Sequence, residues 1–203
     1  MRIAILGWGS LLWEGGREFD EWHDPWQDNG PNLKIEFSRV SKSRLGALTL
    51  VIDAEHGFHT TVAWCLSKRE KLEDVVADLR CREGTTNANI GYVRLDEQTV
   101  LPNPLETEDP IVSWARGMKL DAVVWTALKS NFEEKAKVPF SIDAVVAYVK
   151  TLSPAGKAKA AEYVWRAPEF VQTAVRFALQ QEPWFSKPGS SDQALPASRS
   201  DRA

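Results

Sequence analysis

The sequence predicts an α+β protein, in which a strand-rich core is followed by a helical extension. Up to about residue 128, short apolar or alternating runs separated by turn-forming residues dominate. From residue 141 onward, helical spacing and helix-cap signals dominate instead. Segregation of strands and helices along a chain is typical of the α+β class. We therefore predict a core over 1–130, a helical extension over 131–186 packed on that core, and a disordered Ser- and Pro-rich tail over 187–203.

Composition excludes several classes of function. The chain has 203 residues and a formal net charge of -3, with no basic stripe, so we predict no nucleic-acid partner. No apolar run is long enough to span a bilayer, and the first residues lack a signal-peptide cleavage pattern, so we predict no membrane partner. The two cysteines, Cys65 and Cys81, are too few for a disulfide framework, which favours a cytoplasmic location. The nine tryptophans suggest aromatic walls in a core or pocket.

The first predicted strand, over residues 2–6, runs directly into the turn Gly7-Trp8-Gly9-Ser10-Leu11. Two glycines beside a serine favour a tight turn whose backbone N–H groups point outward, where they can hold a carboxylate or another oxyanion. From these residues alone, a simple exit from the strand is the commoner interpretation. A dinucleotide fingerprint is excluded because Leu12 stands where its third glycine belongs. A nucleophile elbow at Ser10 is excluded because the positions two residues away on each side hold no glycine.

The remaining strands follow from alternation and β-rich runs. Residues 13–32 are rich in tryptophan and turn formers and predict a long loop. Residues 33–41 alternate between apolar and polar side chains, which predicts a half-buried strand. The runs 47–54 and 58–66 flank a turn signal at 55–57 and predict a hairpin. Further strands are predicted over 90–95, 99–101, 111–116 and 121–128, with a proline-rich loop over 102–110.

Helices are predicted where the apolar spacing changes. Leu72, Val75, Val76 and Leu79 recur at helical spacing, which predicts a helix over residues 68–82 with a capping box at Ser67 and Glu70. Gly84 suits the left-handed position that ends such a helix. In the last third, Ser141 caps a helix to about residue 152, Ser153-Pro154 begins a second, and Ala167-Pro168 begins a third.

Two charged residues are candidates for chemistry. Glu83 lies at the carboxyl end of the predicted helix, where the helix dipole disfavours a carboxylate, raises its pKa and makes it a better base. The alternative is an exposed glutamate whose charge is offset by Arg80 and Arg82. Arg44 lies in a connection between strands and can clamp a carboxylate, although a solvent-exposed arginine is the ordinary interpretation. The histidines and cysteines lack metal-ligand spacing, so no metal is predicted.

The order of these features resembles the γ-glutamylcyclotransferase-like superfamily, which includes the ChaC-type and AIG2-like proteins. The turn Trp8-Gly9-Ser10-Leu11 is similar to the Tyr-Gly-Ser-(Asn/Leu) signature of that family. The run Val62–Leu66 and the helix after it resemble the family's next strand and helix. The segment Arg82-Glu83-Gly84, followed by Gly91-Tyr92-Val93, resembles the segment that holds the family's catalytic glutamate. The resemblance covers residues 1–128 and leaves the C-terminal helices unexplained.

The resemblance implies a small mixed β-barrel of about six to seven strands with flanking helices. It also implies an enzyme that releases 5-oxoproline from a small γ-glutamyl compound without a cofactor. In that reaction the α-amine of the substrate attacks its own γ-carbonyl, and the leaving amine departs. By resemblance, Glu83 is the general acid/base. The segment Gly7–Leu11 is the backbone cradle, and Arg44 is a further candidate for substrate binding.

The sequence departs from the family pattern at two positions. Trp8 replaces the signature tyrosine. Leu11 stands where enzymes acting on free γ-glutamyl amino acids often have asparagine, so the turn is closer to the ChaC-type form. A second function therefore stays open, in which a non-catalytic module of the same fold binds a small anion or a partner. The tryptophan-rich loop and the helical extension motivate this alternative.

Overall fold

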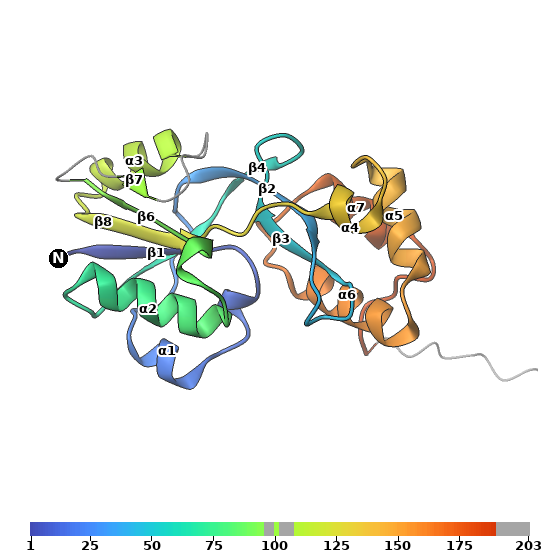
Figure 1. Cartoon of the computed structure of the whole chain (residues 1–203), viewed down its shortest axis with the longest axis horizontal. Coiled ribbons are helices and arrows are strands. Elements are labelled where there is room, and N and C mark those ends of the chain that lie inside the picture. The colour runs from blue at the N-terminus through green and yellow to red at the C-terminus, as the bar shows by residue number, and fades with distance from the viewer. Residues whose placement is uncertain (96–99, 102–107, 190–203) are drawn as a thin grey trace, which may run out of the picture.

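The computed structural model describes residues 1–95, 100–101 and 108–189, and it has the predicted α+β architecture (Figure 1). The strands are β1 (Ile3–Gly7), β2 (Asn32–Val40), β3 (Leu48–Ile52), β4 (Phe58–Thr61), β5 (Ala63–Leu66), β6 (Ile90–Arg94), β7 (Val100–Leu101) and β8 (Ala122–Thr126). The α-helices are α1 (Arg17–Glu21), α2 (Leu72–Glu83), α3 (Glu108–Gly117), α4 (Phe132–Ala136), α5 (Ile142–Thr151), α6 (Pro154–Arg166) and α7 (Ala174–Gln181). Two short 3-10 helices are η1 (Ser10–Leu12) and η2 (Asn87–Asn89).

The strands form two sheets, and closure into the predicted barrel is not confirmed. Within the described residues, one sheet has the order β5-β1-β8-β6-β7 and the other has the order β3-β2-β4. The predicted single strand over 58–66 is divided between these sheets. Its break lies at Val62, which belongs to neither strand, although its backbone N–H still donates to the carbonyl of Pro31, just before β2. The chain passes from one sheet to the other at this point.

The larger sheet is buried on both faces along β1. β1 pairs with β8 in parallel and with β5 in antiparallel orientation. Because side chains alternate along a strand, Ile3 and Ile5 enter a core beneath α2, whereas Ala4 and Leu6 enter the larger core on the other face. This two-sided burial explains the continuous apolar run of β1. Since β1 and β8 are parallel, their carboxyl ends lie at the same edge of the sheet.

The smaller sheet corrects the predicted hairpin. β3 and β4 both pair with β2, one on each side, so the two runs on either side of the turn at 55–57 are not hydrogen-bonded to each other. The connection instead wraps around β2, with the N–H of Asp53 donating to the carbonyl of Lys34. The pairing of β2 with β3 contains a register shift between Glu36 and Arg39. Such a bulge bends the strand and leaves backbone groups opposite it outside the regular ladder.

Residues 111–116, predicted as a strand, belong to helix α3. The β-branched Ile111 and Val112 favour a strand by propensity, but Ile111 and Ala115 are buried while Ser113 between them is exposed. A strand would place all three on one face, whereas a helix places residues four apart together and turns the residue between them away. Most of the predicted loop over 102–110 lies outside the described residues. The long loop over 13–32 contains the short helix α1, which the sequence analysis did not predict.

Helix α2 begins later than predicted but ends as predicted. The Ser67 hydroxyl accepts from the N–H of Arg69 in a local turn, and the backbone N–H of Ser67 donates to the carbonyl of Ile3. Ser67 is therefore held by the sheet, and the helix starts at Leu72 with no side-chain cap. At the other end, Gly84 has a φ of 58°, the left-handed conformation that ends the helix immediately after Glu83.

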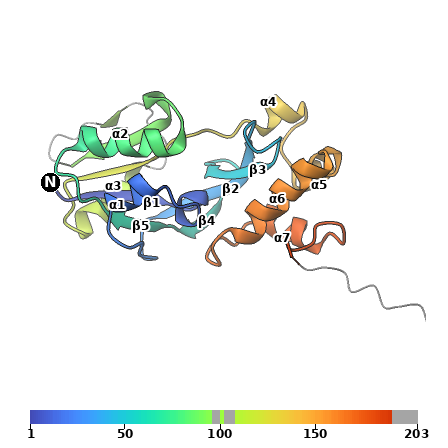
Figure 2. The ribbon, with the colours of Figure 1, turned by 90° about the horizontal axis from the view of Figure 1, so that it is seen from below.

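The C-terminal helices cover the smaller sheet. Ser141 and Ser153 cap α5 and α6 as predicted, with Pro154 at the start of α6. The third helix, α7, starts at Ala174 rather than near Pro168, and α4 was not predicted. The Arg176 guanidinium donates to the carbonyls of Ala167, Pro168 and Val171, and so stabilises a non-helical turn there. Figures 1 and 2 show α6 beside β3, and side chains of α5, α6 and α7 share the larger core with both sheets.

Candidate functional site

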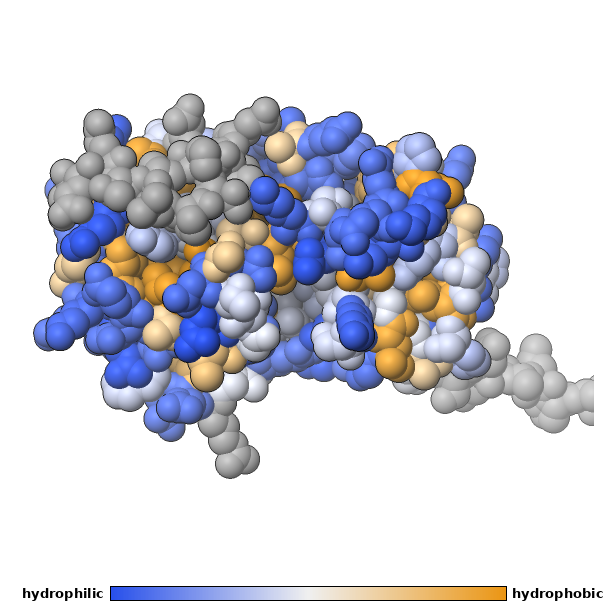
Figure 3. Space-filling model, viewed as in Figure 1, coloured by the Kyte–Doolittle hydropathy of each residue, from blue (hydrophilic) through white to orange (hydrophobic). Residues whose placement is uncertain are grey.

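The predicted site residues line one cavity of about 210 Å³. It lies between the carboxyl end of α2, the turn after β1, the β2–β3 connection and α6. Figure 3 shows a hollow in this face of the molecule, between the part that carries α2 and the helical part. The structure brings together Gly7, Trp8, Gly9, Ser10, Leu11, Arg44 and Glu83. Pockets that take drug-sized ligands have volumes of about 300–1,000 Å³, so this cavity suits a smaller molecule.

The turn after β1 forms one wall of the cavity. Its two glycines are needed because of close neighbours: a Cβ on Gly7 would lie 2.8 Å from the Trp26 ring, and a Cβ on Gly9 would lie 2.5 Å from the Tyr163 hydroxyl oxygen. Ser10–Leu12 forms η1, which has no side-chain cap because Gly9 stands at the capping position before it. The first N–H groups of a helix have no partner within it, so this wall presents polar backbone groups.

Trp8 turns its side chain into the larger core and is 5% exposed. Its indole N–H donates to the carbonyl of Leu50 over 3.4 Å. Leu50 lies opposite the irregularity in the β2–β3 pairing, where the ladder leaves backbone groups available. Trp8 therefore joins the turn to β3.

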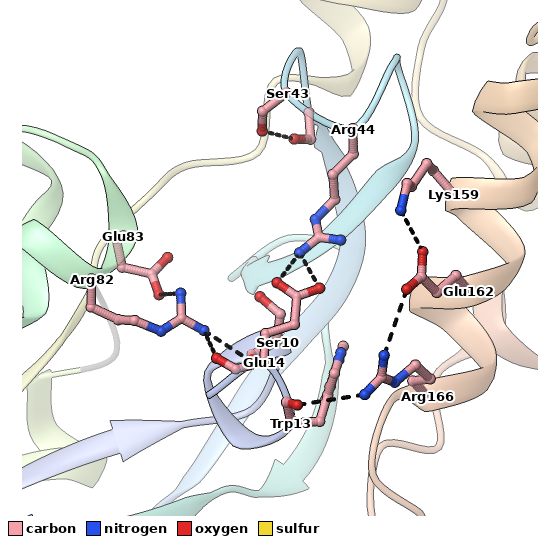
Figure 4. Close-up of polar contacts among 11 residues, drawn as sticks. Ser10, Trp13, Glu14, Ser43, Arg44, Arg82, Glu83, Lys159, Glu162 and Arg166 are labelled. Atoms are coloured by element: carbon pink, nitrogen blue, oxygen red, sulfur yellow. Dashed lines mark hydrogen bonds and ion pairs between the residues drawn. The ribbon is translucent and has the colours of Figure 1, made fainter. Parts of the chain in front are cut away.

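Glu83 is enclosed in the cavity wall rather than exposed at a frayed helix end. Its side chain is 18% exposed, and one carboxylate oxygen lies 3.8 Å from Nη1 of Arg82 (Figure 4). Burial raises the pKa of Glu83 above its usual 4.5, the Glu14 carboxylate raises it further, and the Arg82 and Arg44 guanidiniums partly offset both effects. A carboxyl group with a raised pKa can both accept and return a proton near neutral pH.

Arg82 fastens the end of α2 to the turn after β1. Its Nη2 donates to the carbonyl of Ser10 over 3.2 Å and to the carbonyl of Glu14 over 2.5 Å. Its buried Nε has no hydrogen-bond partner among the residues that the structure describes. These bonds fix the distance between the backbone wall and the neighbouring Glu83 carboxylate. The sequence offered Arg82 only as a counter-charge, because its long-range partners are invisible in a linear pattern.

Arg44 is positioned by a compact loop. The N–H of Gly46 donates to the carbonyl of Ser41, and the carbonyl of Gly46 accepts from the Tyr148 hydroxyl of α5. Gly46 has a φ of 88°, which a residue with a side chain rarely adopts. From this loop, Nη2 of Arg44 bonds both carboxylate oxygens of Glu14, at 2.7 and 2.6 Å (Figure 4). Arg44 thus holds a carboxylate of the chain itself, and Glu14 is a site residue that the sequence analysis missed.

Tyr163 of α6 is a second missed residue. It is 4% exposed and lines the cavity next to Gly9. Its ring lies under the Arg44 guanidinium at 4.8 Å and makes edge contacts with Trp13 and Phe37. Nothing in the sequence distinguishes Tyr163 from any other buried position of a helix. The C-terminal helical segment therefore contributes directly to the cavity.

The described part of the chain contains no group of three or more His, Cys, Asp or Glu side chains placed to hold a metal ion. The histidines are separated, and each bonds its own local partner. No described helix combines the length and the apolar character that crossing a bilayer requires.

Comparisons with models of known families, with curated proteins and with solved structures find no match to this chain. The function is therefore argued from the chemistry of the cavity. Its walls carry guanidiniums from Arg39, Arg44 and Arg82, carboxylates from Glu14 and Glu83, and the Tyr163 phenol. This mixture of charges suits a small zwitterion that carries both a carboxylate and an ammonium group.

Proposed function

We propose that the chain is a γ-glutamylcyclotransferase-like enzyme that releases 5-oxoproline from a small γ-glutamyl compound. One observation carries the proposal: an enclosed carboxyl group with a raised pKa, Glu83, shares a small cavity with the backbone turn Gly7–Leu11. The proposal includes the small mixed β-barrel that the resemblance implies, and a cytoplasmic location. The two sheets described above supply the strands for this barrel.

The reaction needs a proton carrier and donors for a developing charge. The α-nitrogen of the substrate bonds to its γ-carbon, and the bond from that carbon to the leaving nitrogen breaks. Two protons leave the α-ammonium group and two end on the departing amine, so the reaction is balanced without a co-reactant. Glu83 accepts a proton from the α-nitrogen and returns it to the leaving nitrogen. Backbone N–H groups of the turn stabilise the oxyanion formed at the γ-carbonyl.

The direct experiment is to measure 5-oxoproline released from a panel of γ-glutamyl dipeptides, γ-glutamyl amines and glutathione. The proposal predicts turnover of at least one member. A parallel thermal-shift measurement on the same panel separates the alternative function, since a ligand that binds only the folded state raises the melting temperature. Stabilisation without turnover would favour a small-anion-binding module, which the three guanidiniums in the cavity would also suit.

Arg44 provides a prediction about pH. Its guanidinium lowers the pKa of Glu83, so Arg44→Ala removes a positive charge and raises that pKa further. A base must be deprotonated to act, so the acidic limb of the pH–rate profile should move to higher pH in Arg44→Ala. Arg80→Ala, a charge change on the same helix outside the cavity, is the control. If the acidic limb of the pH–rate profile lies at the same pH in Arg44→Ala as in the wild type, that limb does not report the ionisation of Glu83.

A further inference from the structure

The Tyr163 hydroxyl is held at a defined point of the cavity wall. Its oxygen would lie 2.5 Å from a Cβ placed on Gly9, so the phenol fills the space that the missing side chain leaves. Edge contacts with Trp13 and Phe37, at centroid distances of 5.2 and 6.2 Å, fix the ring from two sides. A group held this way loses little further freedom when it binds a ligand.

The hydroxyl hydrogen is available for a ligand. Burial raises the pKa of Tyr163 to about 12, so the phenol is protonated at neutral pH. Backbone hydrogen bonds at Ser10 and Leu50 lower this pKa. A contact that lowers the pKa of a phenol donates to its oxygen, because it favours the charged form. The oxygen therefore accepts from the backbone, and its own hydrogen is left for an acceptor in the cavity.

We propose that Tyr163 donates its hydroxyl hydrogen to an oxygen of the bound substrate, which makes helix α6 part of the active site. The proposal rests on the function proposed above and extends it beyond the resemblance, which covers residues 1–128 only. Trp8 turns its side chain into the core, so the phenol at this turn comes from an element outside the resembling segment. The Ser10 N–H bonds the phenol oxygen, so the substrate oxygen is held by this side chain together with other backbone donors of the turn.

The activity test compares Tyr163→Phe with Tyr92→Phe, using γ-glutamyl-L-alanine as the probe. Tyr92 is a matched control because it lies on β6 outside the cavity. Removal of one donor from an oxyanion site lowers kcat by about 10²–10³-fold. We expect kcat/KM to fall at least tenfold in Tyr163→Phe, after correction for the folded fraction, and to stay within about twofold in Tyr92→Phe. A change of less than threefold in Tyr163→Phe would overturn the proposal.

Failure of the proposed reaction can be distinguished from failure of the proposed Tyr163 contact. If the wild type releases no 5-oxoproline from any γ-glutamyl probe, the proposed reaction is wrong, and binding then decides the role of Tyr163. The probes are 5-oxoproline and L-glutamate, measured by calorimetry. A dissociation constant at least tenfold higher in Tyr163→Phe supports the contact. An unchanged constant, or no binding of either probe by the wild type, overturns it.

A double-mutant cycle tests the position of the hydroxyl without any activity. A Cβ at Gly9 would lie 2.5 Å from the hydroxyl oxygen but 3.6 Å from Cζ of the ring, so only the oxygen stands in its way. Gly9→Ala should lower the melting temperature of the wild type by several degrees and that of Tyr163→Phe by much less. Gly117→Ala is the control, since a Cβ there meets nothing within 4 Å. Equal losses in both backgrounds would contradict the placement of the hydroxyl.

Discussion

Glu83→Gln is expected to lower the rate of 5-oxoproline release by about 10²–10⁴-fold while the protein stays folded. Glutamine keeps the size and polarity of the side chain but cannot carry the proton. The acidic limb of the wild-type profile should lie above the ordinary glutamate pKa of 4.5, because burial disfavours the charged carboxylate. Activity should therefore rise with pH through that limb. Initial rates of product release between pH 4 and pH 9 measure both effects.

Stability separates a catalytic defect from misfolding. Since the folded state raises the pKa of Glu83, ionisation of this group works against folding once the pH exceeds 4.5. Glu83→Gln removes that cost, so its melting temperature at neutral pH should be no lower than that of the wild type. Glu73→Gln, an exposed change in the first turn of the same helix, should leave the rate unchanged and lower stability slightly, because the helix dipole favours a carboxylate there. A fully active Glu83→Gln protein would remove Glu83 from the mechanism.

Glu36→Gln is expected to stabilise the protein at alkaline pH. Glu36 is 1% exposed on β2, and burial raises its pKa to about 7 despite hydrogen bonds from the Thr173 side chain and the N–H groups of Phe37 and Val175. Its neutral form is therefore the one that the fold accommodates. The difference between pKa values of 4.5 and about 7 corresponds to about 3 kcal/mol of folding free energy.

The sign and the pH window follow from linkage. A raised folded-state pKa means that the stability contributed by the protonated group is complete below pH 4.5 and is lost as the pH rises to about 7. The free energy of unfolding of Glu36→Gln, relative to that of the wild type, should thus be about 3 kcal/mol more favourable at pH 8 than at pH 4, as measured by urea denaturation. Glu55→Gln, whose side chain is 84% exposed, is the control. A constant difference across this range would show that Glu36 is not buried as a neutral acid.

Local signals in the sequence predicted the elements that depend on local chemistry. The strand before Gly7, the left-handed Gly84 after Glu83 and the caps at Ser141 and Ser153 all lie where they were expected. Each depends on a few neighbouring residues, such as a serine that bonds an N–H group three residues later. The existence of these elements could therefore be predicted from short windows of sequence.

Elements and contacts that depend on distant partners could not be predicted. Ile111 and Val112 favour a strand by propensity, yet burial of one helical face makes this segment α3. The 58–66 run looks continuous, but its first half pairs with β2 and its second half with β1, so the chain crosses between the two sheets at Val62. At the site, Tyr163 and Glu14 could not be found, because the sequence does not show that α6 packs beside β3 or that Arg44 folds back on Glu14.

The most direct test of the account is the identity of the product formed in water enriched in ¹⁸O. The account predicts that a γ-glutamyl dipeptide yields 5-oxoproline and one equivalent of free amino acid, with no ¹⁸O in the 5-oxoproline, because the α-nitrogen of the substrate is the attacking group. Mass spectrometry of both products measures this. Release of glutamate carrying ¹⁸O would show hydrolysis by water and would contradict the account.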